Sequence, residues 1–150
     1  MAEVQEVAKY IIKSLPVDNL KLQKLLYYSQ GIHLVLHEKT PLFPESIEAW
    51  DYGPVVPEVY RAYKQHGFDV IPPAEDEPLP LGIEEIDAVD KALACFGEMS
   101  GVALIHQTHY EQPWRSAYKP GWPSRKISID VMYDYFMNSL DFSDESEEQS

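Results

Sequence analysis

Four of the five histidines form pairs whose spacing suits a metal ion. His33 and His37 are four residues apart, while His106 and His109 are three apart and Glu111 follows closely. On a helix, either spacing can direct two imidazoles to one side, and metal sites of helical bundles take ligands from such positions. The zinc-protease signature also needs a glutamate directly after the first histidine, which this sequence lacks. A metal-dependent hydrolase built on these residues is therefore an alternative hypothesis, opposed by the simpler interpretation that the histidines are structural or exposed.

The sequence carries no arrangement suited to nucleophilic catalysis. Its single cysteine, Cys95, lies on a predicted apolar helix face beside Leu93 and Phe96, where a thiol is usually an inert small hydrophobe. No serine has a nucleophile-elbow context, and no glycine-rich phosphate loop follows a predicted strand. A lone cysteine also excludes an internal disulfide and fits a reducing compartment. We therefore expect a protein that is not an enzyme and holds no cofactor.

Aromatic side chains gather beside breaks in the chain. The sequence has ten tyrosines and three tryptophans, and several stand next to glycine or proline, as in Trp50–Pro54 and at Pro113–Trp114. Tyrosine and tryptophan bury a large area and keep a polar handle, so they are enriched where proteins meet. The competing interpretation is that they fill gaps between irregular connections. The residues predicted to bind a partner are Tyr27, Tyr28, Trp50, Asp51, Tyr52, Gly53, Pro54, His109 and Trp114.

Composition narrows the classes of function. Aspartate and glutamate number 25 against 12 lysines and arginines, which gives a formal net charge of −13. Such a chain repels phosphate backbones, so we expect no nucleic-acid binding by this chain alone, and a transcriptional regulator is only the second alternative. The acidity would instead steer a basic protein partner. No apolar run has membrane-spanning length and no signal segment opens the chain, so we expect a cytoplasmic protein without a membrane partner.

The stretch Asn19–His37 predicts the helix around which the chain is organised. Its apolar residues recur at helical spacing, and no formally charged residue occurs in Leu25–Leu36. An amphipathic surface helix would show a polar face here, so we expect a central helix contacted on several sides. Gly31 predicts that another element packs closely at that point, and Asp18 suits the N-cap.

The remaining pattern predicts a mainly α-helical protein. Apolar stripes and capping residues predict the other helices, at 2–15, 55–67, 84–99 and 100–109, from 112 and from 128. The alternating segment Ile47–Tyr52 predicts a short strand that pairs with Leu42–Phe43 in a small hairpin. The proline-rich stretch 71–80 predicts an extended loop within the domain. We expect one compact domain of about six helices with a small β-hairpin over residues 1–138, and a disordered acidic tail at 139–150.

Three blocks of residues carry a family resemblance. They are Leu22–Gly31, Trp50-x-x-Gly53-Pro54-Val55 with Val59-Tyr60, and Thr108-His109-x-x-x-Pro113-Trp114. In this order they resemble the Panacea antitoxin domain family, which includes SocA-like antitoxins and phage-associated GepA-type proteins. The resemblance covers roughly Val4 to Phe136 and implies a mostly helical domain that neutralises a cognate toxin by binding it.

The same resemblance implies which partners to expect. A toxin protein is the first, and because a SocA-like member acts as an adaptor that delivers its toxin to a protease, a cytoplasmic protease is a further candidate. Some relatives carry a helix-turn-helix domain beside this one. Here the first predicted helix starts at the N-terminus, so we expect no such domain and no autoregulation by this chain alone. The oligomeric state stays open.

Overall fold

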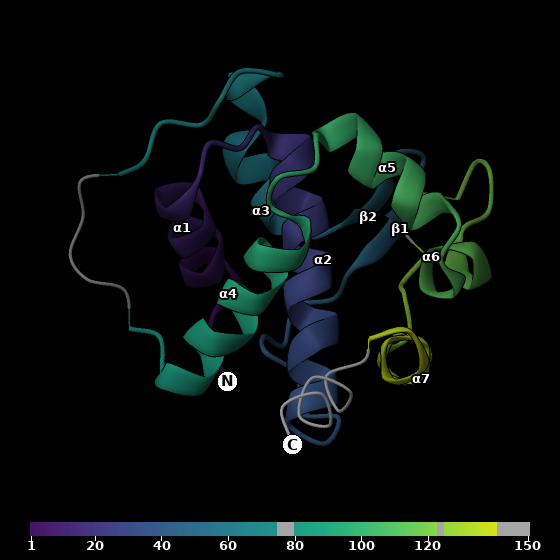
Figure 1. The fold of residues 1–150 in the computed structure, drawn as a ribbon. Helices are drawn as coiled ribbons and strands as arrows, with labels where there is room; N and C mark the ends of the chain where they lie inside the picture. The colour runs from purple at the N-terminus through teal and green to yellow at the C-terminus, as the bar shows by residue number, and fades with distance from the viewer. Residues whose placement is uncertain (75–79, 123–124, 141–150) are drawn as a thin grey trace.

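Helix α2 runs through the middle of the fold, with the other elements arranged around it (Figure 1). The computed structural model describes residues 1–74, 80–122 and 125–140. In chain order the elements are α1 (Val4–Ser14), α2 (Asn19–Leu36), β1 (Glu48–Trp50), β2 (Gly53–Val55), α3 (Pro57–Tyr63), the 3₁₀ helix η1 (Lys64–His66), α4 (Ile83–Phe96), α5 (Gly101–His109), α6 (Gln112–Ala117) and α7 (Ile129–Ser139). The predicted fold class, mainly helical with a small antiparallel hairpin, is confirmed. None of the described helices is long and apolar enough to cross a membrane.

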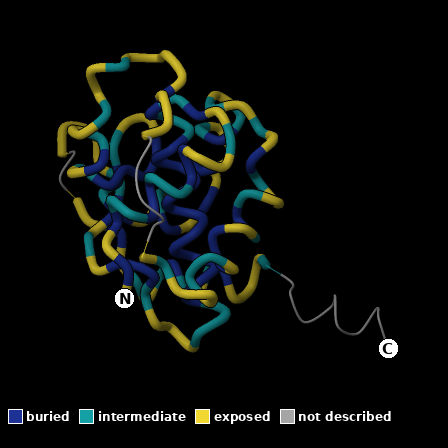
Figure 2. The backbone as a smooth tube through the Cα atoms, turned by 90° about the vertical axis from the view of Figure 1, so that its left-hand side faces the viewer, coloured by how far each residue is buried: buried dark blue, intermediate teal, exposed yellow. Residues whose placement is uncertain are grey.

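The predicted central position of α2 is confirmed by its burial. Every residue from Leu22 to Leu34 is buried, because α1, α3, α4, α5, α7 and β2 all pack against this helix. Figure 2 shows the same arrangement as a buried interior under an exposed outer layer of loops and helix ends. The Asp18 carboxylate caps the helix as predicted, accepting a hydrogen bond of 2.8 Å from the backbone N–H of Lys21.

Close packing at Gly31 brings α7 against α2. The ring of Phe136 lies so near the Gly31 backbone that a Cβ at that position would collide with it. Phe136 is itself buried, and its ring centroid lies 5.4 Å from that of Tyr27 and 6.0 Å from that of Tyr28. The close neighbour predicted from the glycine is therefore the last helix of the described chain.

The hairpin uses a different second strand from the one predicted. β1 pairs antiparallel with β2, so the prediction that it pairs with Leu42–Phe43 is wrong. The side chain of Gln30 on α2 forms hydrogen bonds with the backbone of those two residues instead. Their buried polar groups are therefore satisfied without a neighbouring strand. The pairing also shifts the start of the next helix. Helix α3 begins at Pro57 and not at the predicted Val55, because Val55 belongs to β2.

Two buried glutamines of α2 satisfy the irregular backbone that follows the helix. The Gln30 side chain accepts from Leu42 N–H at 2.6 Å and donates to the Phe43 carbonyl at 2.9 Å. The Gln23 side chain accepts from Val56 N–H at 2.9 Å. A buried backbone group without a hydrogen-bond partner costs about 1–3 kcal/mol of stability. These two side chains supply the hydrogen bonds that further strands would otherwise provide. Helix α2 thus fixes the path of the chain up to the start of α3.

Two other expectations need comment. Cys95 is exposed, so its predicted position on a buried apolar face is wrong. Helix α4 ends one residue later and buries Ala88, Val89 and Ala92, which leaves the thiol outside the packed part. The predicted acidic tail lies almost wholly in residues 141–150, which are outside the described residues.

Replacing Gly31 with alanine is expected to destabilise the protein, although alanine favours a helix over glycine by about 1 kcal/mol. The new Cβ would displace the buried ring of Phe136, and overpacking of this kind typically costs about 1–3 kcal/mol. The measurement is the free energy of unfolding in urea, followed by circular dichroism. Because the two sites share one contact, Gly31→Ala combined with Phe136→Leu should lose less stability than the sum of the single changes. A single variant as stable as the wild type would contradict the close approach.

Candidate partner-binding site

The turn between β1 and β2 carries most of the residues predicted to bind a partner. We use "the corner" for this turn together with three rings that pack on it: Trp50–Pro54, His109, Trp114 and Tyr118. Gly53 has a φ of +104°, a conformation that side chains rarely adopt. A Cβ at Gly53 would also lie 2.7 Å from Cε of Lys24. The turn therefore requires glycine at this position both for its backbone shape and for the lysine beneath it.

A stack of three rings supports the corner. The ring centroids of His109 and Trp114 are 4.2 Å apart, and those of Trp114 and Tyr118 are 4.4 Å apart. Helix α5 ends at His109, and α6 carries Trp114. Tyr118 follows four residues later, a spacing that places two side chains on the same side of a helix. The short connection between the two helices is what brings the first ring over the second.

Each ring of the stack also forms a hydrogen bond with the turn. His109 Nε2 donates to the Asp51 carbonyl at 3.0 Å, and Trp114 Nε1 donates to the Trp50 carbonyl at 2.8 Å. The Tyr118 hydroxyl donates to the Asp51 carboxylate. His109 must be the donor because a carbonyl only accepts, and burial lowers its pKa, which favours the neutral ring. Three bonds to two adjacent residues hold this turn in one conformation.

The corner presents one large aromatic side chain to solvent. Tyr52 at its tip is 65% exposed, and Asp51 beside it is exposed as well. Trp50 is partly buried and packs edge-on against Tyr60, with centroids 5.1 Å apart. An aromatic group on a rigid support loses little conformational entropy on binding, so it suits the anchor of a protein interface.

A lysine is buried directly beneath the turn. Lys24 has no exposed surface, and its Nζ donates to the Pro54 carbonyl at 3.0 Å. Burial lowers its pKa from 10.5 to about 7, and the negative charge of Asp18 opposes this shift. The hydrogen bond from the Lys24 amino group ties α2 to β2 at the point where Gly53 passes over the side chain.

Tyr27 and Tyr28 bind a buried carboxylate. Their hydroxyls donate to the two oxygens of Glu111 at 2.9 and 2.8 Å, and Gln107 Nε2 donates to the same carboxylate at 3.2 Å. Burial raises the pKa of Glu111, while the hydrogen bonds from these donors lower it. Because Glu111 stands at the N-cap of α6, the cluster anchors the helix that carries Trp114 onto α2.

The structure brings together two junctions that are far apart in the sequence. His109 reaches a turn 58 residues earlier in the chain. Of the residues predicted to bind a partner, Tyr27 and Tyr28 are buried beneath the corner, and Gly53 and Pro54 are buried within it. The others, in the turn and the stack, keep exposed surface.

Sequence reasoning missed two residues of this site. Lys24 is one, because a lysine in an apolar stretch usually extends its stem along the surface and keeps its charge in water. No sequence signal distinguished it from that common case. Tyr118 is the other, and its four-residue spacing from Trp114 was a signal available in the sequence.

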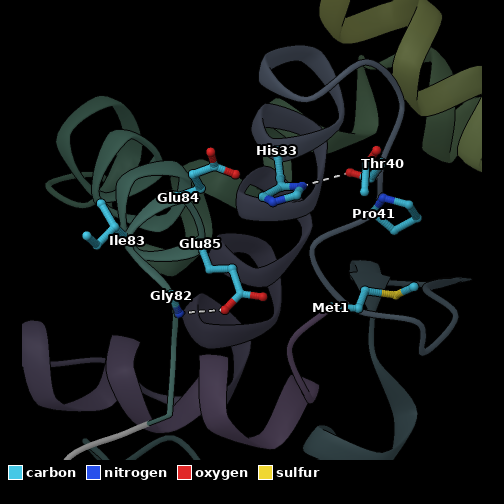
Figure 3. A pocket seen from close by; sticks show the side chains of 8 residues that line it. All are labelled: Met1, His33, Thr40, Pro41, Gly82, Ile83, Glu84 and Glu85. Atoms are coloured by element: carbon cyan, nitrogen blue, oxygen red, sulfur yellow. Dashed lines mark hydrogen bonds between the residues drawn. The ribbon is translucent and has the colours of Figure 1, made fainter.

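The histidines considered as metal ligands are divided between two places. The His33 ring donates through Nδ1 to the Thr40 carbonyl at 2.7 Å and lines an open hollow of about 530 Å³ near the end of α2 and the start of α4 (Figure 3). In the same hollow, Glu85 accepts from Gly82 N–H. His109 belongs to the corner. Across residues 1–74, 80–122 and 125–140, no three His, Cys, Asp or Glu side chains are placed to hold a metal ion, so the hydrolase alternative has no assembled site there.

A helical domain that holds an aromatic turn rigid at its surface is typical of a protein-binding domain. The family model described as "Antitoxin SocA-like, Panacea domain" matches residues 22–115, from α2 into α6, and the chain belongs to this family. The resemblance inferred from the sequence is confirmed.

One relative is the protein named Antitoxin SocA of Caulobacter vibrioides (strain NA1000 / CB15N), which is 32% identical to this chain over 118 residues. The alignment covers 67% of this chain and 59% of the relative, so the chain spans less than two thirds of the relative's length. No solved structure gives a significant match.

The buried lysine leads to a prediction about pH. The unfolded chain holds a proton on Lys24 up to a pH near 10.5, whereas the folded protein releases it near pH 7. Because the unfolded state binds more protons in this interval, the free energy of unfolding should rise between pH 7.5 and 9.5, by up to about 1.4 kcal/mol per pH unit. In Lys24→Met this rise should disappear, and stability at pH 7.5 should increase by about 1–3 kcal/mol because folding no longer requires a lysine to be desolvated and to lose its proton.

Urea unfolding across the pH series measures both effects. Lys21→Met, at the partly buried lysine three residues earlier, controls for the loss of a lysine in the same helix. A rise with pH that persists in Lys24→Met would show that another group causes it.

Proposed function

We propose that this chain is an antitoxin that neutralises a cognate toxin protein by direct binding, with the corner as the contact surface. Membership of the SocA-like family supports the class of function. The observation that carries the choice of surface is Tyr52, an exposed aromatic on a turn held by three side-chain hydrogen bonds. A surface prepared in this way binds without the entropic cost of ordering a loop.

In this proposal the chain acts by binding and catalyses no reaction. The two ionisable groups beneath the corner, Lys24 and Glu111, are enclosed by the protein and bonded to its own residues. Groups in this position are suited to hold the turn and the stack in place. A hydrolytic site would instead need them to face a cavity open to a substrate.

A cytoplasmic protease is a second partner in the proposal. Its support is the resemblance to antitoxins that deliver their toxins for degradation. The corner lies on one side of α2, while α1 and α4 lie on the other (Figure 1). A toxin bound at the corner would leave those two helices accessible to a protease.

Tyr52→Ala is expected to weaken toxin binding without unfolding the protein. The toxin is sought as the product of a co-transcribed neighbouring reading frame whose expression is lethal without this protein. Truncating an aromatic anchor costs about 2 kcal/mol or more, so affinity should fall about 30-fold or more and rescue of growth should fail. The side chain is exposed, so the melting temperature should stay close to that of the wild type.

Two further variants make the result decisive. Phe68→Ala removes an aromatic side chain of similar exposure that follows η1 and belongs to no part of the corner, and it should bind the toxin normally. His109→Ala removes a ring that supports the turn, so it should lower both stability and binding. If rescue follows the melting temperature in every variant, or if Phe68→Ala is as defective as Tyr52→Ala, the toxin binds elsewhere.

A further inference from the structure

One part of the chain departs from its general acidity. From Gln112 to Ile129 the sequence has four basic residues and no acidic one. One residue in six is acidic over the whole chain, so an even distribution would place about three acidic residues in this stretch. The stretch begins with α6 and continues into the connection to α7, directly after the aromatic stack.

This segment folds back onto the corner. Arg125 donates through Nε to the Ala117 carbonyl at 2.7 Å, which closes the connection on itself. The backbone then runs beside β1, where Ala49 N–H donates to the Arg125 carbonyl at 2.9 Å and Ile127 N–H donates to the Ile47 carbonyl at 2.8 Å. These bonds hold Arg125 and Lys126 beside β1, the strand that leads into the turn carrying Tyr52, while Arg115 belongs to α6, the helix whose Trp114 bonds the same turn.

Three of the four cations are exposed and have no acidic partner. Arg115, Lys119 and Arg125 are exposed, and none forms an ion pair with any described residue. Lys119 Nζ lies 5.4 Å from the centroid of the Trp122 ring, and that ring is 57% exposed. The fourth cation, Lys126, is exposed as well, but it lines a hollow with three glutamates and one arginine, so acidic groups outnumber basic ones around it.

We propose that Arg115, Lys119, Arg125 and the exposed Trp122, here called the basic rim, bind an acidic segment of the protein that occupies the corner. The proposal rests on the proposed function and names the chemistry of the partner. Guanidinium groups bind carboxylates with paired hydrogen bonds, and a cation beside an indole offers charge and apolar contact together. A partner that presents an acidic segment would find three exposed cations and an indole within one stretch of the chain at the rim.

The charge of the rest of the chain makes such a contact selective. The net charge of −13 attracts a partner that is basic overall but repels an acidic segment of that partner from most of the surface, so the rim would set the direction in which the partner docks. A nucleic acid fits less well, because its charge extends along the strand beyond the rim and meets the acidic remainder of the surface. A short acidic stretch of protein meets the rim alone.

The first test reverses two charges of the rim in the full chain, Arg115→Glu with Lys119→Glu. Affinity for the neighbouring toxin, measured by calorimetry at 50 mM salt, should fall at least tenfold, and the loss should shrink at 300 mM salt. Both side chains are exposed, so the melting temperature should change little. Replacing acidic residues of the toxin segment with lysine should weaken binding to the wild type and restore binding to the reversed variant.

A probe that needs no toxin separates this proposal from the proposed function. A fluorescein-labelled peptide of five Asp-Glu repeats should bind the wild type at 50 mM salt and lose binding in the reversed variant, while a Ser-Gly peptide of equal length should bind neither. Lys64→Glu with Lys91→Glu makes the same change in net charge on η1 and α4, and it should leave binding of the peptide and the toxin intact.

Four outcomes would overturn the rim proposal. Equal losses in the two double variants would show a general charge effect. Toxin binding lost in Tyr52→Ala but retained in the rim variant would leave the corner standing and reject the rim. Tight binding of a single-stranded oligonucleotide that the rim variant loses would identify a nucleic acid as the occupant. An effect of the rim variant that appears only when residues 141–150 are deleted would mean that the chain's own acidic end covers the rim.

Discussion

The burial of α2 from Leu22 to Leu34 is the constraint on which the rest of the structure depends. A helix surrounded on all sides must satisfy its polar side chains inside the protein, because water cannot reach them. Gln23 and Gln30 do so by bonding the backbone of the chain that follows the helix, and Lys24 does so by bonding Pro54. The same bonds satisfy irregular backbone that has no sheet to join. One helix thereby organises both the core and the segment that carries the corner.

The corner is rigid because it is held from beneath and from one side. Beneath it, Lys24 and the close approach of Gly53 fix the height of the turn above α2. From the side, rings supplied by α5 and α6 hold its carbonyls, and Glu111 anchors α6 through two tyrosines of α2. A buried lysine lowers stability relative to an apolar side chain, so its place under the turn points to a role in shaping this surface.

Charge divides the surface into two kinds. The chain as a whole is acidic, which repels other polyanions, whereas the stretch from α6 to the start of α7 has basic residues and no acidic one, and its later part runs beside β1. Aromatic contact area and local charge then occur side by side. Binding surfaces of proteins commonly combine the two, since apolar anchors supply affinity and charges supply orientation and speed of association.

The sequence by itself determined the helical class, the central helix with its Asp18 cap, the close contact at Gly31 and the family, because periodicity, capping and glycine act locally or leave ordered motifs. It also pointed to Trp50–Pro54 and to His109 as unusual junctions. Only the tertiary structure decided that these junctions meet, that β1 pairs with β2, and that Lys24 is buried. Each of these three features depends on contacts between residues that are distant in the sequence. The local sequence pattern does not specify such contacts, because the packing of the other elements around α2 determines which segments meet.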